Sequence, residues 1–217
     1  MAINTYATLI TAVTEWLARD QDATLIARIP DFIVLTEAKL NRLLFVRQME
    51  QRAITVIDTT VSEPDYIALP TDFQSMRRMR LSSVSGKPLI AFMSGTQMDD
   101  FRNNRGNATG QPQYFTIYGT EIELAPTPDK NYTVEMIYRK LIPALTASNT
   151  TNWLLTLAPD LYLYGVLLES SPYIQADERI ATWGAGFSSA LDGLNNLGMS
   201  STFNAGPIQV RILGATP

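Results

Sequence analysis

The sequence has 217 residues, of which 46% are apolar, and its 17 basic and 21 acidic side chains give a net charge of -4. This length suits one compact unit with one elaboration, and folding should bury roughly 70% of the unfolded chain's surface. Cysteine and histidine are both absent. Their absence excludes disulfides, Ser-His and Cys-His catalysis, imidazole ligands and zinc fingers. The acidic balance argues against a protein that grips nucleic acid through its phosphates.

No targeting or membrane segment is expected. The opening Met-Ala-Ile-Asn-Thr-Tyr lacks the basic start and apolar run of a signal peptide. The most apolar stretch, residues 153–168, is shorter than the ~20 residues that cross a bilayer, and it contains Pro159 and Asp160. We interpret this stretch as a buried helix.

The first 45 residues are predicted to form a pair of helices. Thr5 suits the N-cap of the first helix, in which apolar residues recur at helical spacing as far as Leu17. Pro30 suits the first position of the second helix, and an apolar stripe continues from there to Leu44.

From residue 46 to residue 142, β-branched and aromatic residues separated by turn formers predict a β-rich segment. Its clearest element is a hairpin with Gly119-Thr120 as a type II′ turn. The expected pairs are Tyr118 with Glu121, Ile117 with Ile122 and Phe115 with Leu124. In this register the apolar residues share one face, and Thr116, Glu121 and Glu123 take the other face, which we expect to be polar. A third strand is expected at residues 132–139, and a short helix at 94–104.

Helical patterning returns at Asn152. We expect Tyr164 and Leu168 to lie on the buried face of one helix, and another helix to run from about Asp177 past Leu191. The last fifteen residues contain Gly206-Pro207 and then an apolar alternation typical of a strand, without a sequence-adjacent partner.

The predicted fold class is α+β: a helical bundle formed by the N- and C-terminal helices, with an inserted β-rich domain and an extended C-terminal arm. The predicted divisions are residues 1–45 and 143–202 for the helical domain, 46–142 for the β-rich insertion and 203–217 for the arm.

No residue is predicted to be catalytic, to ligate a metal or to bind a cofactor. The carboxylate pairs Asp99-Asp100, Glu121 with Glu123, and Asp177-Glu178 fall on elements where exposed, solvated charge is expected. Arg77, Arg78 and Arg80 form a small basic cluster, which we interpret as a solvated or interface feature in preference to a nucleic-acid patch, because no aromatic platform accompanies it.

The helical run at residues 152–165, followed by 167–169 and Pro172-Tyr173, resembles the head-to-tail adaptor (connector) family of tailed bacteriophages. Similar motifs precede it in the same order. They are residues 6–9, Trp16-Leu17, 29–33, 37–42, 69–73 and the hairpin at 114–126. These are packing and turn motifs, so their order along the chain carries the resemblance, which spans residues 1–197.

The resemblance implies a structural protein of the virion neck, built as a helical bundle with an inserted β-domain. It further implies a dodecameric ring mounted on the portal protein, with tail or nozzle proteins docked beneath it. The genome would pass through the lumen during ejection without specific binding, and assembly would take place in the host cytoplasm. No enzyme activity, cofactor or membrane partner is implied.

Within this setting the strand-like tail is interpreted as an attachment arm. The residues assigned to the portal or neighbour-subunit interface are Phe203, Ile208, Val210, Arg211 and Ile212. Such a segment can join the sheet edge of another protein by strand addition.

Three alternatives remain open from the sequence: a tail-tube or neck-stopper component, a carbohydrate-binding β-module, and a hydrolase that uses carboxylates. The last two are less favoured, because Trp16, Trp153 and Trp183 all lie in predicted helices and because histidine and cysteine are missing.

Overall fold

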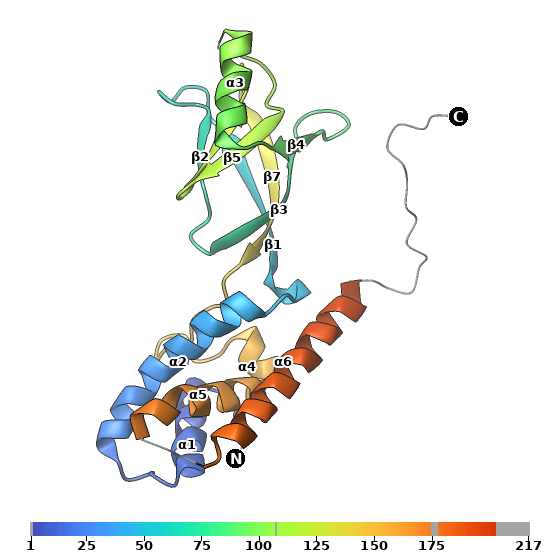
Figure 1. The fold of residues 1–217 in the computed structure, drawn as a ribbon. Helices are drawn as coiled ribbons and strands as arrows, with labels where there is room; N and C mark the ends of the chain where they lie inside the picture. The colour runs from blue at the N-terminus through green and yellow to red at the C-terminus, as the bar shows by residue number, and fades with distance from the viewer. Residues whose placement is uncertain (1, 107, 175–177, 203–217) are drawn as a thin grey trace. The chain divides into compact units, whose positions relative to one another are not determined.

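A computed structural model describes residues 2–106, 108–174 and 178–202 (Figure 1). The chain forms two compact units. The first, which we call the helical unit, combines the residues up to Gln48 with those from Ile142 onward. The second, which we call the β unit, is Met49–Leu141.

The helical unit is arranged around helix α5 (Pro159–Ile174), which packs against α1 (Tyr6–Leu17), α2 (Ala23–Leu43), α4 (Trp153–Leu157) and α6 (Ile180–Thr202). A short 3-10 turn, η1 (Arg47–Met49), follows α2. Helix α5 is apolar around most of its circumference, which is what a helix with neighbours on several sides requires. Gly165 permits the closest approach, since a Cβ there would lie 2.5 Å from Cγ2 of Thr36 on α2.

The helix starts follow side-chain capping. Thr5 caps α1 as predicted, with Thr8 completing a capping box. The predicted start of the second helix at Pro30 is wrong. Asp22 caps α2 by accepting hydrogen bonds from the backbone N–H groups of Thr24 and Leu25, both at 3.1 Å, so Pro30 lies inside the helix.

The β unit contains one seven-stranded sheet, nearly closed and barrel-like, in the order β1-β7-β3-β4-β5-β6-β2. Its strands are β1 (Glu50–Ile57), β2 (Tyr66–Ala68), β3 (Phe73–Leu81), β4 (Leu89–Phe92), β5 (Tyr114–Tyr118), β6 (Glu121–Ala125) and β7 (Tyr132–Lys140). All neighbours are antiparallel except β4 and β5. Helix α3 (Gly95–Arg105) forms the crossover that this parallel pair needs.

The predicted hairpin register is confirmed, with Ile117 opposite Ile122 and Phe115 opposite Leu124. The prediction that its second face is polar and solvated is wrong for Thr116 and Glu123, which are 3% and 5% exposed. Glu123 is buried because it faces Arg102 of α3, a helix folded over this side of the sheet.

The predicted fold class is also wrong. The protein is a mixed α/β fold with a nearly closed seven-stranded sheet and, in the described parts of the chain, six α-helices; it is not a helical bundle carrying an inserted β-rich domain. The physical reason is that helix α3 connects the parallel strands β4 and β5, so the segment predicted to be β-rich contains a helix as an integral part of its fold. Strands β1 and β2 follow one another in the chain through a short connection, yet they stand at opposite ends of the strand order, so the sheet must curve toward closure. The predicted arm, residues 203–217, lies outside the described residues.

The buried face of α5 also differs from the prediction. Tyr164 and Leu168 are only partly buried, whereas Leu167 is fully buried. Leu167→Ala should lower the free energy of unfolding by about 2–5 kcal/mol, since it leaves a cavity among packed helices. Leu168→Ala is the matched control and should cost clearly less. Urea unfolding of both variants measures the difference, and equal losses would contradict this packing.

Candidate functional site

An apolar opening lies in the sheet of the β unit, between β3 and β5. Strand β3 pairs with β7 from Phe73 to Leu81, with register shifts at Gln74 and Arg77, but it pairs with β4 only at Met79 and Arg80. Strand β4 then pairs with β5 through Ala91 and Phe92. Among the described strands, β3 from Ser75 to Arg78 therefore has a neighbour on one side only. Strand β4 thus leaves β3 after Ile90 and stays with β5, so the opening lies between β3 and β5 beside this part of β3.

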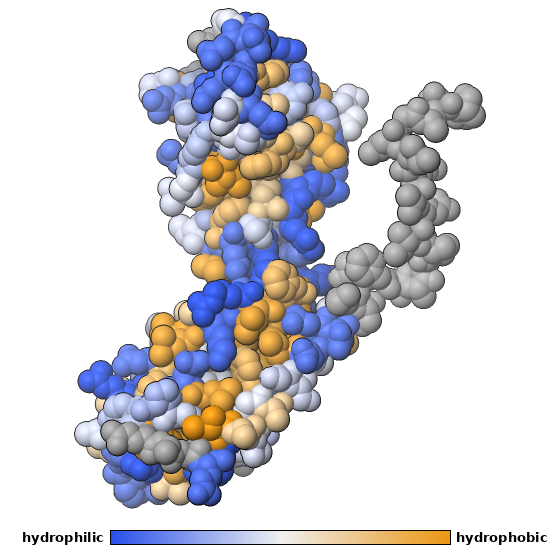
Figure 2. Space-filling model, in the orientation of Figure 1, coloured by the Kyte–Doolittle hydropathy of each residue, from blue (hydrophilic) through white to orange (hydrophobic). Residues whose placement is uncertain are grey.

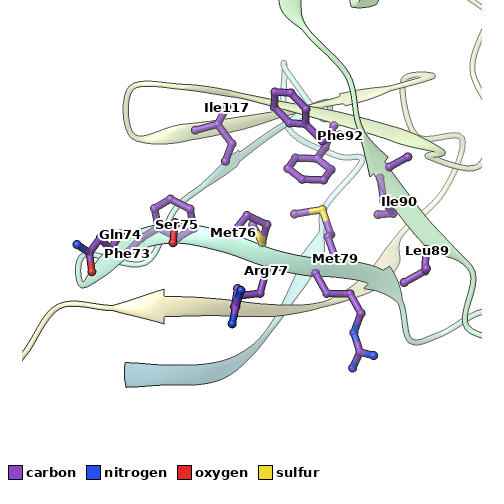
Figure 3. Close-up of a pocket in the computed structure, with 13 residues that line it drawn as sticks. Phe73, Gln74, Ser75, Met76, Arg77, Met79, Leu89, Ile90, Phe92 and Ile117 are labelled. Atoms are coloured by element: carbon purple, nitrogen blue, oxygen red, sulfur yellow. The ribbon is translucent and has the colours of Figure 1, made fainter. Parts of the chain in front are cut away.

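We call this opening the sheet slot. It has a volume of about 610 Å³. Its apolar lining includes Met76, Met79, Ile90, Phe92, Phe115 and Ile117. Figure 3 shows Met79, Phe92 and Ile117 pointing into the slot while Arg77 points away. Phe92 is 67% exposed even though its ring lies 5.7 Å from that of Phe115. A lining of this kind suits an extended apolar segment of another protein, which gains backbone hydrogen bonds from the strand edges.

The predicted basic cluster is held in ion pairs of the β unit. Arg77 contacts Glu50 at 3.0 Å, and Arg80 contacts Glu135 at 2.6 Å. Glu135 also accepts two hydrogen bonds from Arg52, at 2.9 and 2.7 Å. Its side chain is 3% exposed, and the bonds from Arg52 and Arg80 lower the pKa of its carboxyl. Two of the three arginines, Arg77 and Arg80, thus form ion pairs with glutamates of the same sheet.

A second ionic cluster joins α3 to the sheet. Nη2 of Arg102 lies 2.7 Å from Asp65 Oδ2 and 2.9 Å from Glu123 Oε1, and it donates to the carbonyl oxygen of Leu124 at 2.9 Å. Burial raises the pKa of Glu123, and the charge of Arg102 opposes that rise. The two carboxylates are held by one cation, which is a structural arrangement and not a poised acid-base pair.

In the helical unit, Glu37 of α2 is 5% exposed. It accepts a hydrogen bond from the backbone N–H of Leu145 at 2.8 Å and another from the Tyr162 hydroxyl at 2.9 Å. Asn152 donates to that hydroxyl at 2.7 Å. Burial raises the pKa of Glu37, and its two hydrogen bonds oppose the rise. This carboxyl is enclosed by the helices.

The remaining carboxylates considered from the sequence do not converge. Asp99 and Asp100 are exposed on α3, and Glu121 is exposed at the hairpin turn. Asp177 lies outside the described residues. Across residues 2–106, 108–174 and 178–202, no group of three or more acidic side chains is placed to hold a metal ion.

The three tryptophans, Trp16, Trp153 and Trp183, belong to α1, α4 and α6 of the helical unit. The β unit therefore offers no tryptophan platform of the kind that sugar-binding modules use. Within the described ranges, no helix has the length and apolarity needed to span a membrane.

The predicted interface residues Phe203, Ile208, Val210, Arg211 and Ile212 all lie outside the described residues. Sequence reasoning missed the sheet slot. Two features point to it. Strand β4 is short, and Ser94, the N-cap of α3, follows Phe92 so closely that β4 cannot extend further along β3.

In comparison with known protein families, residues 4–211 match the model described as SU10 adaptor protein. Comparison with curated proteins gives no match. The family match takes in both compact units, so it concerns the protein as a whole and not a single module.

Replacing Arg102 tests the cluster between α3 and the sheet. Arg102→Met should lower the free energy of unfolding at neutral pH by roughly 3 kcal/mol, because it leaves two largely buried carboxylates without a cation. Arg77→Met, which removes an exposed ion pair with Glu50, should cost about 0–1 kcal/mol. Chemical denaturation of the two variants makes the comparison, and similar losses would show that the Arg102 cluster is not a structural element.

Glu37 gives a pH-dependent prediction. Its pKa is raised in the folded chain, so its favourable contribution is complete below the unfolded pKa and is lost as the pH rises through the folded pKa. Glu37→Gln removes the titration and keeps an oxygen acceptor. Between about pH 4 and about pH 7, the stability of the wild type should therefore fall relative to that of the variant. Urea midpoints across this range test it, and parallel pH profiles would refute a raised pKa.

Proposed function

The chain belongs to the SU10 adaptor protein family, a family of phage head-to-tail adaptors, and we propose that it forms the ring that joins the portal to the tail. The observation that carries this proposal is the extent of the match, which covers residues 4–211 of the 217. In our proposal the ring is dodecameric and sits in the virion neck, after assembly in the host cytoplasm.

The charge of the chain supports a lumen through which DNA passes without being held. The net charge is -4, whereas proteins that bind nucleic acid tightly use many free cationic side chains on the phosphates. Arg52, Arg80 and Arg102 are engaged with carboxylates of their own unit. An acidic ring with internally paired arginines lets the genome slide during ejection.

The surfaces of the β unit support binding to other proteins. The sheet slot offers apolar side chains beside strand edges, and it brings no acid, base or nucleophile pair together. Structural proteins of a tail or nozzle can be joined through such edges, because main-chain hydrogen bonds give affinity and pockets for alternate side chains give specificity.

The C-terminal segment 203–217 is proposed as the arm that attaches the ring to the portal or to a neighbouring subunit. The support is its sequence, in which Ile208, Val210 and Ile212 alternate with polar or charged residues after a Gly-Pro break. On one side of a strand these three apolar residues fill pockets of the acceptor, and Arg211 points the other way.

Deletion of residues 204–217 tests attachment separately from folding. The truncated protein should keep its melting temperature almost unchanged, because the arm contributes to assembly and not to the core. It should also fail to form stable complexes with purified portal rings. Electron microscopy and sedimentation of portal mixtures measure this, with the full chain as control.

Two outcomes contradict the proposal in different ways. If the truncated protein unfolds, the segment belongs to the core. If it forms rings on the portal as the full chain does, attachment depends on other surfaces. If the full chain itself does not bind portal rings, the proposed adaptor function is wrong.

A further inference from the structure

A groove on the helical unit lies between the α4–α5 corner and α6. Its volume is about 510 Å³. Leu157 and Tyr164 form one wall, and Gly186, Ala190 and Gly193 form the other. Leu157 and Leu197, which both line the groove, are large apolar side chains that remain exposed. Figure 2 shows hydrophobic residues reaching the surface of this unit on the side in view. We call this feature the helical groove.

The small residues of α6 keep the helical groove open. Gly193 lies inside the helix, where glycine is a poor helix former. A Cβ at Gly193 would meet nothing within 4 Å, so packing of the monomer does not require glycine there. Gly186 differs, since a Cβ there would lie 2.9 Å from the Tyr164 ring. Small side chains let another helix approach closely.

The same unit carries an apolar ridge that its own chain leaves uncovered. Val34 and Leu35 of α2 are 60% and 51% exposed, and Ala38 is exposed one turn further on. Residues 34 and 38 form one row of the helix surface, and such rows pack into grooves of other helices. The opposite side of α2, with Ile33, Thr36 and Glu37, is buried. We call residues 34, 35 and 38 the α2 ridge.

The charges around the two features are complementary. Arg28 and Arg42 lie exposed on α2, on either side of the α2 ridge along the helix. Asp31, also exposed, pairs with Arg28 at 3.4 Å. The helical groove has one charged lining residue, Asp160, and Asp192 is exposed on α6 beside it. The ridge is therefore net positive and the groove net negative, which orients one against the other.

We propose that the α2 ridge of one copy docks in the helical groove of a second copy, an inference that rests on the proposed ring. Val34 and Leu35 enter the groove against Ala190 and Gly193, and arginines of α2 approach Asp160. Ridge and groove are different surfaces of one unit. Contact between them is consequently head-to-tail, and such contacts close into rings when the rotation per subunit permits.

The natural chain has no cysteine, so engineered thiols report this contact without background. Leu35→Cys and Ala190→Cys are prepared as separate variants and as one double variant, and all are assembled on portal rings and oxidised. The mixture of single variants should give a disulfide-linked dimer, and the double variant should give a ladder of higher species. Each single variant alone should give no disulfide-linked dimer, because like positions do not meet in a head-to-tail contact. Leu35→Cys mixed with Gly184→Cys is the matched control and should not cross-link.

Filling the helical groove separates assembly from folding. Gly193→Leu should leave the melting temperature unchanged or raise it, because a Cβ at this position meets nothing within 4 Å in the monomer and leucine favours the helix. The same variant should lose ring formation. Gly184→Leu is the control on the same helix, since a Cβ there also meets nothing within 4 Å and Gly184 does not line the groove. It should assemble like the wild type.

The outcomes distinguish this contact from the ring itself. If portal-bound rings form but the mixed thiols stay unlinked and Gly193→Leu assembles normally, the ridge-and-groove contact is wrong and the ring stands. Cross-linking of a single variant with itself would overturn the head-to-tail geometry. If the wild type forms no ring on the portal, the proposed function fails, and the contact fails with it.

Discussion

The helical unit depends on a buried carboxylate that connects distant parts of the chain. Glu37 on α2 accepts from the backbone N–H of Leu145, 108 positions later, and from the hydroxyl of Tyr162 on α5. Asn152 donates to that hydroxyl and to the carbonyl of Pro143, and its side-chain oxygen caps α4 through Leu155. Desolvating a carboxyl is costly unless its oxygens are satisfied. The burial of Glu37 is therefore tolerated only in the arrangement that brings α2, the segment after β7 and α5 together.

This requirement explains how the two ends of the helical unit find each other across the β unit. The chain leaves α2 and returns at Ile142, whose backbone N–H is bonded to the Asn41 side chain at 2.9 Å. A polar network of this kind is specific, because a shifted register would strand a charge or a backbone group in an apolar interior. The hydrophobic faces of α2 and α5 supply the driving force, and the network selects one way of bringing them together.

The sequence predicted what local patterns determine. The Thr5 cap, the hairpin register at Gly119-Thr120 and the helical nature of residues 153–168 all follow from interactions within a few residues. It did not predict the closure of the sheet. The pairing of β1 with β7, the short contact of β3 with β4 and the crossing of α3 are long-range events. Glu123 shows the limit well, since alternation placed it on a polar face and only the position of Arg102 reveals that this face is covered.

The same limit applies to the surfaces on which function depends. From the sequence, Leu35 looks like any other apolar residue of an amphipathic helix, for which burial is expected. Only the positions of α5 and α6 show that it faces outward. The charged groups, by contrast, are largely engaged inside the fold, as with Glu135 between Arg52 and Arg80. This chain pairs its buried charges internally. It leaves apolar ridges, grooves and strand edges exposed, and such a surface is typical of a protein that works in an assembly. In the ring that we propose, burial of these exposed surfaces against other subunits supplies free energy that the monomer does not use. Contacts between subunits, in this proposal, strengthen the junction between head and tail.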